Sequence, residues 1–305
     1  MAIMSASLSA VALGNKMYCF FQGGNDSGEL WYAIWNGQYW ENKQQVPETT
    51  LSAGPSAVAF NNKIYCFHQG SGDSGELWYN IFDGNLWEGD KQVPGTSLSD
   101  GPSAVVFNNK IYCFHQGSRE SGSLWYNVLD GDHWEGEQEV PDTTLSAGPS
   151  AVVFGNNLYC FHQGARDSGQ LWYNILSAEG LEGDQQVSGT SLSDGPSAVN
   201  VLDNTLYSFH QGSRESGELW YNFLDQNGWQ GDQQVPHSSM SDGLSAIFLK
   251  TSFTAFIKAP GSLASFTIIL YLTDNRQVKY RFISGGLSTI RRRIHDLRHC
   301  GSATL

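Results

Sequence analysis

The segment Gly75-Glu76-Leu77-Trp78-Tyr79-Asn80 contains a tripeptide, Leu-Trp-Tyr, that occurs five times along the chain. Self-similarity at a fixed period of 20 to 50 residues is typical of repeat architectures. The tryptophans of the five copies are separated by 47, 47, 47 and 48 residues; they are Trp31, Trp78, Trp125, Trp172 and Trp220. The sequence therefore predicts five near-identical structural units.

Each unit contains four segments with the composition of β-strands. In the second unit they span residues 54–60, 64–70, 76–82 and 86–94, and turn-forming residues such as Asn61-Asn62 separate them. Four antiparallel strands per unit, without helical periodicity, are typical of a β-propeller blade. We expect an all-β propeller with the small-residue first strand at the axis and the polar fourth strand at the rim. The expected blades are residues 5–47, 52–94, 99–141, 146–188 and 193–236.

A sixth unit starts at residue 241, but the pattern is lost after Ile247, where the sequence becomes basic and free of tryptophan. Back-translated and read one nucleotide earlier, residues 254–269 can match the other repeats at 15 of 16 positions. We interpret residues 248–305 as an out-of-frame sixth blade; the alternative is a genuine basic C-terminal domain. The interpretation predicts an open propeller edge through which copies of the chain can associate.

The composition limits the classes of partner. The 305-residue chain is 40% hydrophobic, and its formal net charge is −13. Residues 1–247 alone carry −20, since they hold 8 of the 17 basic and 28 of the 30 acidic residues, which disfavours nucleic acid as a partner. No apolar run approaches about 18 residues and the N-terminal segment lacks a basic region. We expect a soluble protein without membrane insertion, cytoplasmic or released without a signal peptide.

Four cysteines, Cys19, Cys66, Cys113 and Cys160, recur at one equivalent position of successive repeats. A disulfide joins complementary places, whereas these are symmetry-related copies in different blades. We expect buried structural thiols, and no metal site or cofactor.

The segment Ser71-Gly72-Asp73-Ser74-Gly75-Glu76-Leu77-Trp78 matches Ser-x-Asp-x-Gly-x-x-Trp and resembles the Asp-box of sialidase-type propellers. The resemblance implies a structural turn in which the aspartate holds backbone N–H groups. It departs from that family in joining the second and third strands of a blade rather than the third and fourth. The blade plan over residues 5–247 is also similar to that of fungal and bacterial propeller lectins, which implies fucose binding between blades.

Three recurring groups are candidate sugar contacts. A His-Gln pair at the end of the second strand offers hydrogen bonds to hydroxyl groups, an arginine in the next turn offers a clamp, and the Leu-Trp-Tyr tryptophan offers a stacking face. The candidates are His68, Gln69, Trp78, His115, Gln116, Arg119, Trp125, His162, Gln163, Arg166, Trp172, His210, Gln211, Arg214 and Trp220.

Each group also has a structural interpretation. The histidines can be core residues bonded to a neighbouring carbonyl, the arginines can form turn salt bridges, and most aromatic rings are expected to pack between blades. A sialidase needs several arginines from different blades on one carboxylate, an asymmetry that equivalent repeats lack. The sequence thus favours a multivalent carbohydrate-binding propeller without catalysis that binds glycans or glycoproteins. A protein-interaction scaffold is the alternative, and a sialidase-like glycosidase ranks third.

Overall fold

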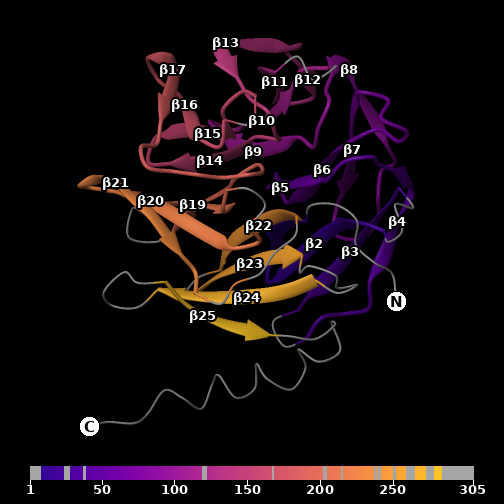
Figure 1. Ribbon diagram of the computed structural model, residues 1–305. Helices are drawn as coiled ribbons and strands as arrows, with labels where there is room; N and C mark the ends of the chain where they lie inside the picture. The colour runs from indigo at the N-terminus through magenta and orange to yellow at the C-terminus, as the bar shows by residue number, and fades with distance from the viewer. Residues whose placement is uncertain are drawn as a thin grey trace.

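The computed structural model describes residues 8–23, 28–36, 39–118, 122–166, 168–201, 205–213, 216–236, 238, 242–249, 252–258, 265–272 and 278–283, with backbone alone at 199–201 and from 242 onward. All regular elements in these ranges are β-strands, arranged as six sheets around a common centre (Figure 1). No helix among the described residues is long and apolar enough to cross a membrane.

The five repeats form five antiparallel sheets, and successive strands pair in chain order, as predicted. The first sheet is β1 (Ser9–Leu13), β2 (Lys16–Gln22), β3 (Glu29–Trp35) and β4 (Gln44–Thr50). The second is β5 (Ser56–Phe60), β6 (Lys63–Gln69), β7 (Glu76–Phe82) and β8 (Lys91–Ser97). The third is β9 (Ser103–Phe107), β10 (Lys110–Gln116), β11 (Ser123–Asp130), β12 (His133–Trp134) and β13 (Gln138–Thr144).

The remaining sheets repeat this plan. The fourth is β14 (Ser150–Phe154), β15 (Asn157–Gln163), β16 (Leu171–Ser177) and β17 (Gly180–Gln186). The fifth is β18 (Ser197–Val201), β19 (Thr205–Gln211), β20 (Leu219–Asp225) and β21 (Gly228–Gln234). The sixth is β22 (Asp242–Leu249), β23 (Ser252–Lys258), β24 (Ser265–Leu272) and β25 (Val278–Ile283).

The segment that contains the loss of the repeat pattern after Ile247 forms the sixth sheet. Its four strands pair antiparallel in chain order, and β22 lies against β18 on one side and against β1 on the other. The edge that was expected to be open is therefore occupied, and the six sheets close a ring (Figure 1). Residues 284–305 lie outside the described part of the chain.

The first strand of each blade lies at the axis, as predicted, and is joined to the next blade by a serine. The backbone N–H of Ala57 donates to Ser9 Oγ at 2.9 Å, and Ala104 donates to Ser56 Oγ at the same distance. Ala151 and Ala198 continue the series with Ser103 and Ser150, again at 2.9 Å. Small side chains are needed here because the inner strands of neighbouring blades approach closely, and the serine supplies the acceptor that each alanine N–H requires.

The fourth strand differs from its predicted position in the first three blades. In the second blade β8 starts at Lys91, and Trp87 forms only an isolated bridge with Phe82. Gly89 has a φ of 88°, which turns the chain between the two segments. Gly183, the equivalent glycine of the fourth blade, lies inside β17 and has no positive φ, so that strand is continuous.

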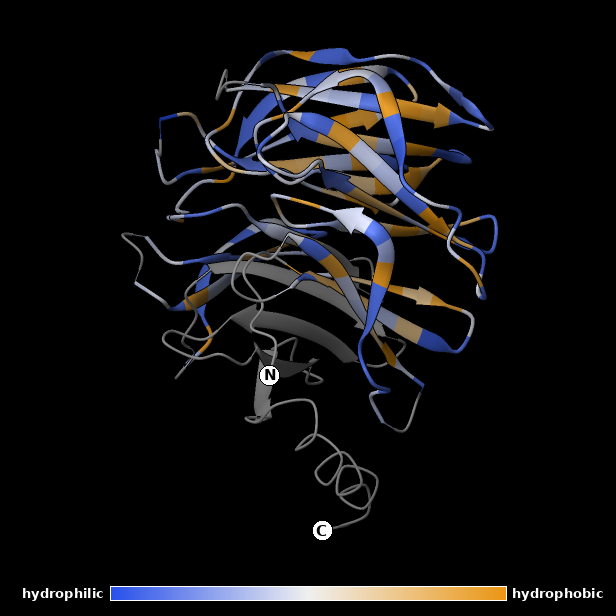
Figure 2. Cartoon of the chain, turned by 90° about the vertical axis from the view of Figure 1, so that its right-hand side faces the viewer, coloured by the Kyte–Doolittle hydropathy of each residue, from blue (hydrophilic) through white to orange (hydrophobic). Residues whose placement is uncertain are grey.

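The hydrophobic core lies between neighbouring blades. The rings of Phe20 and Tyr32 in the first blade receive the edge of Trp87 from the second, at centroid distances of 5.9 and 5.6 Å. Phe67 and Tyr79 receive Trp134 in the same way, at 6.1 and 5.6 Å. The outer tryptophans are therefore packing residues, as expected for most of the rings. The alternation of apolar and polar residues along the strands, which buries one set between sheets, is visible in Figure 2.

Candidate functional site

The recurring histidine is a core residue. His68, His162 and His210 are fully buried, with 0% of their surface exposed. In each, Nδ1 donates to the carbonyl oxygen of the following glutamine at 3.2 to 3.3 Å. Nε2 faces a carboxylate oxygen of the outer strand, at 3.0 Å from Asp90, 2.8 Å from Asp184 and 3.1 Å from Asp232. Both ring nitrogens are therefore occupied, which matches the structural interpretation of these histidines.

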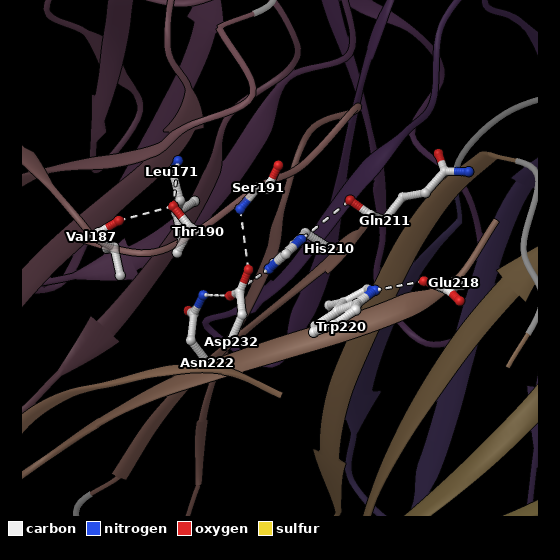
Figure 3. A network of polar contacts seen from close by, with 10 residues as sticks. All are labelled: Leu171, Val187, Thr190, Ser191, His210, Gln211, Glu218, Trp220, Asn222 and Asp232. Atoms are coloured by element: carbon white, nitrogen blue, oxygen red, sulfur yellow. Dashed lines mark hydrogen bonds and ion pairs between the residues drawn. The ribbon is translucent and has the colours of Figure 1, made fainter. Parts of the chain in front are cut away.

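In the fifth blade the carboxylate is the centre of a larger network (Figure 3). Asp232 Oδ1 accepts from Asn222 Nδ2 at 2.7 Å and lies 3.1 Å from His210 Nε2. Its Oδ2 accepts from the backbone N–H of Ser191, which belongs to the chain leaving the fourth blade, at 3.1 Å. One side chain thus joins three strands and two blades.

The third blade carries a variant of this contact. Nε2 of His115 lies 3.1 Å from Asn127 Oδ1 and 3.4 Å from Glu137 Oε1, while Glu137 accepts from the Ser97 backbone N–H at 3.1 Å. Burial lowers the pKa of His115 to about 4, although the hydrogen bonds to Gln116 and Asn127 act in the opposite direction. Burial also raises the pKa of Glu137.

The glutamine after each histidine is also structural. Gln69 Nε2 donates to the carbonyl oxygen of Leu98 at 3.2 Å, and Gln116 donates to Leu145 at 3.0 Å. Gln163 repeats the contact with Leu192 at 3.2 Å. The glutamines Gln69, Gln116, Gln163 and Gln211 are 2 to 6% exposed. The His-Gln pairs therefore hold the blades together rather than line a surface.

The Leu-Trp-Tyr tryptophans reach the surface of the protein. Trp78, Trp125, Trp172 and Trp220 are all half-buried. Trp78 Nε1 donates to Glu76 Oε2 at 3.3 Å, and Trp220 donates to Glu218 at 3.2 Å, as Figure 3 shows. Each of these pairs combines a partly exposed indole with a carboxylate at its edge.

A glycine fixes the position of the indole. A Cβ at Gly70 would lie 3.0 Å from Trp78 Nε1, and one at Gly212 would lie 2.7 Å from Trp220 Nε1. Any side chain would push the ring away, which explains the Gln-Gly sequence at the end of the second strand. The carboxylates of Glu76 and Glu218 were missed in the sequence analysis, although residues two apart on a strand share a face and this spacing was visible.

The remaining candidates are the arginines, which lie in the turn between the second and third strands. Arg166 is exposed, with a φ of 58°, whereas Arg119 and Arg214 lie outside the described residues. Asp73, the acid of the matched Asp-box, is exposed, and no described residue donates a hydrogen bond to it. The turn instead uses Ser74, whose Oγ accepts from the Glu76 N–H at 3.3 Å.

The four repeated cysteines are buried free thiols, as predicted. Burial raises the pKa of Cys19 to about 12, so its thiol stays protonated and unreactive at neutral pH. The described residues contain no group of three or more His, Cys, Asp and Glu side chains placed to hold a metal ion.

The fold places the chain in the class of β-propellers built from six antiparallel sheets. No protein-family model and no curated protein matches the sequence. Among solved structures it is similar to the six-bladed lectin of Aleuria aurantia, described with a novel fucose recognition mode, at 15% identity and a TM-score of 0.69 over 94% of this chain and 98% of that one.

Two further structures share the fold. AofleA of Arthrobotrys oligospora matches at 14% identity and a TM-score of 0.66, over 93% of this chain and 88% of that one. A protein of unknown function from Dyadobacter fermentans matches at 10% identity and a TM-score of 0.63, over 85% and 92%. At these identities the likeness establishes the propeller fold, and the ligand has to be argued from the residues of this chain.

Proposed function

We propose that the protein is a multivalent carbohydrate-binding propeller without catalytic activity, and that it binds fucosylated glycans or glycoproteins. The observation that carries the proposal is the repeated half-buried tryptophan with its neighbouring polar groups, of which Trp78 with Glu76 is the clearest case. The face of an indole stacks on the C–H face of a pyranose, and a carboxylate accepts hydrogen bonds from its hydroxyl groups.

Repetition suits such a site. One ring and its neighbouring polar group give a weak contact with a monosaccharide, but several such tryptophan sites on one rigid ring raise the avidity for a glycan-bearing surface. Fucose is the first sugar to test, since the lectin of Aleuria aurantia, a structure of similar fold, has been solved with α-methyl-L-fucoside. The exposed Arg166 can add a donor to its site. The Asp-box relationship of residues 71–78 remains a hypothesis about the origin of the turn.

Calorimetric titration with methyl α-L-fucoside tests the proposal. Wild-type protein should bind several sugars per chain, and Trp78→Ala should weaken one of these sites about tenfold through the lost stacking. Tyr39→Ala is the matched control, because Tyr39 is an exposed aromatic residue, 42% accessible, outside the tryptophan sites. Absence of binding to any member of a glycan array, with retained capture of a protein partner, would favour the interaction-scaffold alternative.

A further inference from the structure

The first blade departs from the others at the positions that form the polar contact of the repeat, including Ala33, where the other four blades have an asparagine. Where the second blade has His68 and Asp90, the first has Phe21 and Lys43, in each case 47 residues earlier. Phe21 is buried, with 2% of its surface exposed. The histidine and its carboxylate have therefore been replaced together within one chain.

The replacement changes what lies over the tryptophan. Lys43 Nζ sits 4.5 Å from the centroid of the Trp31 ring, within the range of a cation–π contact. It is the one such contact among the described residues. Trp31 Nε1 donates to Glu29 at 3.1 Å, as the equivalent tryptophans of the second and fifth blades donate to Glu76 and Glu218, so the ring itself keeps its usual orientation.

From these contacts we infer that Lys43 occupies the stacking face of Trp31, and that the first blade is a self-closed version of the sugar site. The inference rests on the proposed function and sharpens it: binding is confined to the second to fifth blades, and Lys43 is the residue that excludes the first blade.

The contrast with the other blades explains why the lysine adopts this position. Asp90, Asp184 and Asp232 are each held by a buried histidine, at 2.8 to 3.1 Å, which keeps them directed to the blade interior. Phe21 offers no hydrogen-bonding group, so an aspartate at position 43 would lose that partner. A lysine instead lays its aliphatic stem and ammonium group on the indole.

A sugar that stacks on Trp31 must displace this contact. Loss of an exposed cation–π contact alone weakens binding by about two- to fivefold, and the lysine also fills the volume that the pyranose would occupy. Because a single site is weak, these two effects of Lys43 should make sugar binding at the first blade too weak to be counted by calorimetry.

The test is the number of methyl α-L-fucoside molecules bound per chain, measured by calorimetry. The double variant Phe21→His with Lys43→Asp recreates the pair of the second blade and should add one site to the wild-type number. Lys43→Ala, which leaves the core unchanged, should also open the Trp31 face. Lys16→Ala, an exposed lysine of the same blade, is the matched control and should leave the stoichiometry at the wild-type value.

A second measurement does not depend on sugar binding. The Hε signals of Lys43 should be shifted upfield by the ring current of Trp31 and should return to ordinary positions in Trp31→Leu. If wild-type protein binds no sugar, the proposed function is wrong, while this shift still tests the Lys43 contact. If wild-type protein binds sugar and neither Lys43→Ala nor the double variant gains a site, or if the upfield shift is absent, the self-closed site is refuted.

Discussion

The fifth blade and the sheet that follows it have the same backbone plan and different side-chain chemistry. β19 starts at Thr205 and β23 at Ser252, both seven residues long and 47 residues apart, so the second strand continues the repeat period. Yet the sequence has no tryptophan after Trp229 and no His-Gln-Gly in β23. Strand ladders need only backbone groups, whereas the contacts between blades need particular side chains.

The comparison separates two contributions to the order of a propeller: the placement of the inner strand and the side-chain contacts between blades. The inner strand places a sheet in the ring, and β22 lies between β18 and β1 without the full repeat sequence. The polar contacts of the intact blades, such as His210 with Asp232, then hold each blade to the outer strand and to the chain leaving the blade before it. A sheet that lacks them is expected to be the weak sector of the ring.

The largest effect should come from restoring the sixth blade. A gene shifted by one nucleotide after the codon for Ile247 should encode a conforming blade, more acidic than the present tail. The regained hydrogen bonds and aromatic contacts amount to about 4 kcal/mol, or roughly 10 °C in melting temperature. Calorimetry of both proteins measures this. An unchanged melting temperature, with sequencing of the locus confirming the present frame, would favour a genuine basic domain.

The next largest effect on stability should come from Asp232→Ala, which removes a polar contact of the fifth blade and so makes this blade more like the sixth. The substitution removes the shared partner of His210, Asn222 and the Ser191 N–H, and should cost about 3 kcal/mol in urea unfolding. Asp90→Ala, which removes the partner of His68 Nε2, should cost less, about 2 kcal/mol.

A combined variant tests whether the pair acts as a unit. His210→Phe with Asp232→Lys introduces the pair of the first blade, Phe21 and Lys43, and should recover part of the loss caused by Asp232→Ala. A double variant less stable than Asp232→Ala would show that the first-blade pair is not transferable.

The contacts of the intact blades should also differ in their response to acid. Burial depresses the pKa of His115 to about 4, below the ordinary value of 6.5, so the unfolded chain takes up a proton more readily than the folded one. Stability should therefore fall as the pH drops from 6.5 toward 4, by on the order of 1–2 kcal/mol at pH 5. His115→Gln should flatten the urea-unfolding profile in this window; an identical slope in both proteins would contradict the assignment.

The fold was readable from the sequence because its signals are local and repeated. The period of Leu-Trp-Tyr, the turns and the small-residue strand each predict a blade and agree with one another. The position of the fourth strand was missed in part, because Gly89 and Gly183 take different backbone conformations in equivalent sequences. Neighbouring packing decides between those conformations, and a local pattern does not contain it.

The site was less readable, because burial of a polar residue depends on a distant partner. His68 at a strand end fits a surface ligand as well as a core position, and only its contact with Asp90, 22 residues away, decides between them. The sequence did contain one indication of this contact, since the first repeat has Phe21 and Lys43 where the second has His68 and Asp90. Comparing repeats of one chain as if they were homologues would have shown that these two positions touch.

The smallest expected effect tests the seam of the ring, which is the place where β22 of the sixth sheet lies against β1 of the first blade. Alanine N–H groups donate to serines of the preceding blade four times, from Ser9 to Ser150, and Ser245-Ala246 keeps the same dipeptide in the sixth unit. If the sixth sheet continues the series, Ser245→Ala should cost about 1 kcal/mol in urea unfolding. Ser103→Ala, within the intact blades, should cost the same and serves as the reference. A neutral Ser245→Ala beside a destabilising Ser103→Ala would mean that the sixth sheet occupies its place by backbone packing alone, and the seam would then be the point at which the ring opens first.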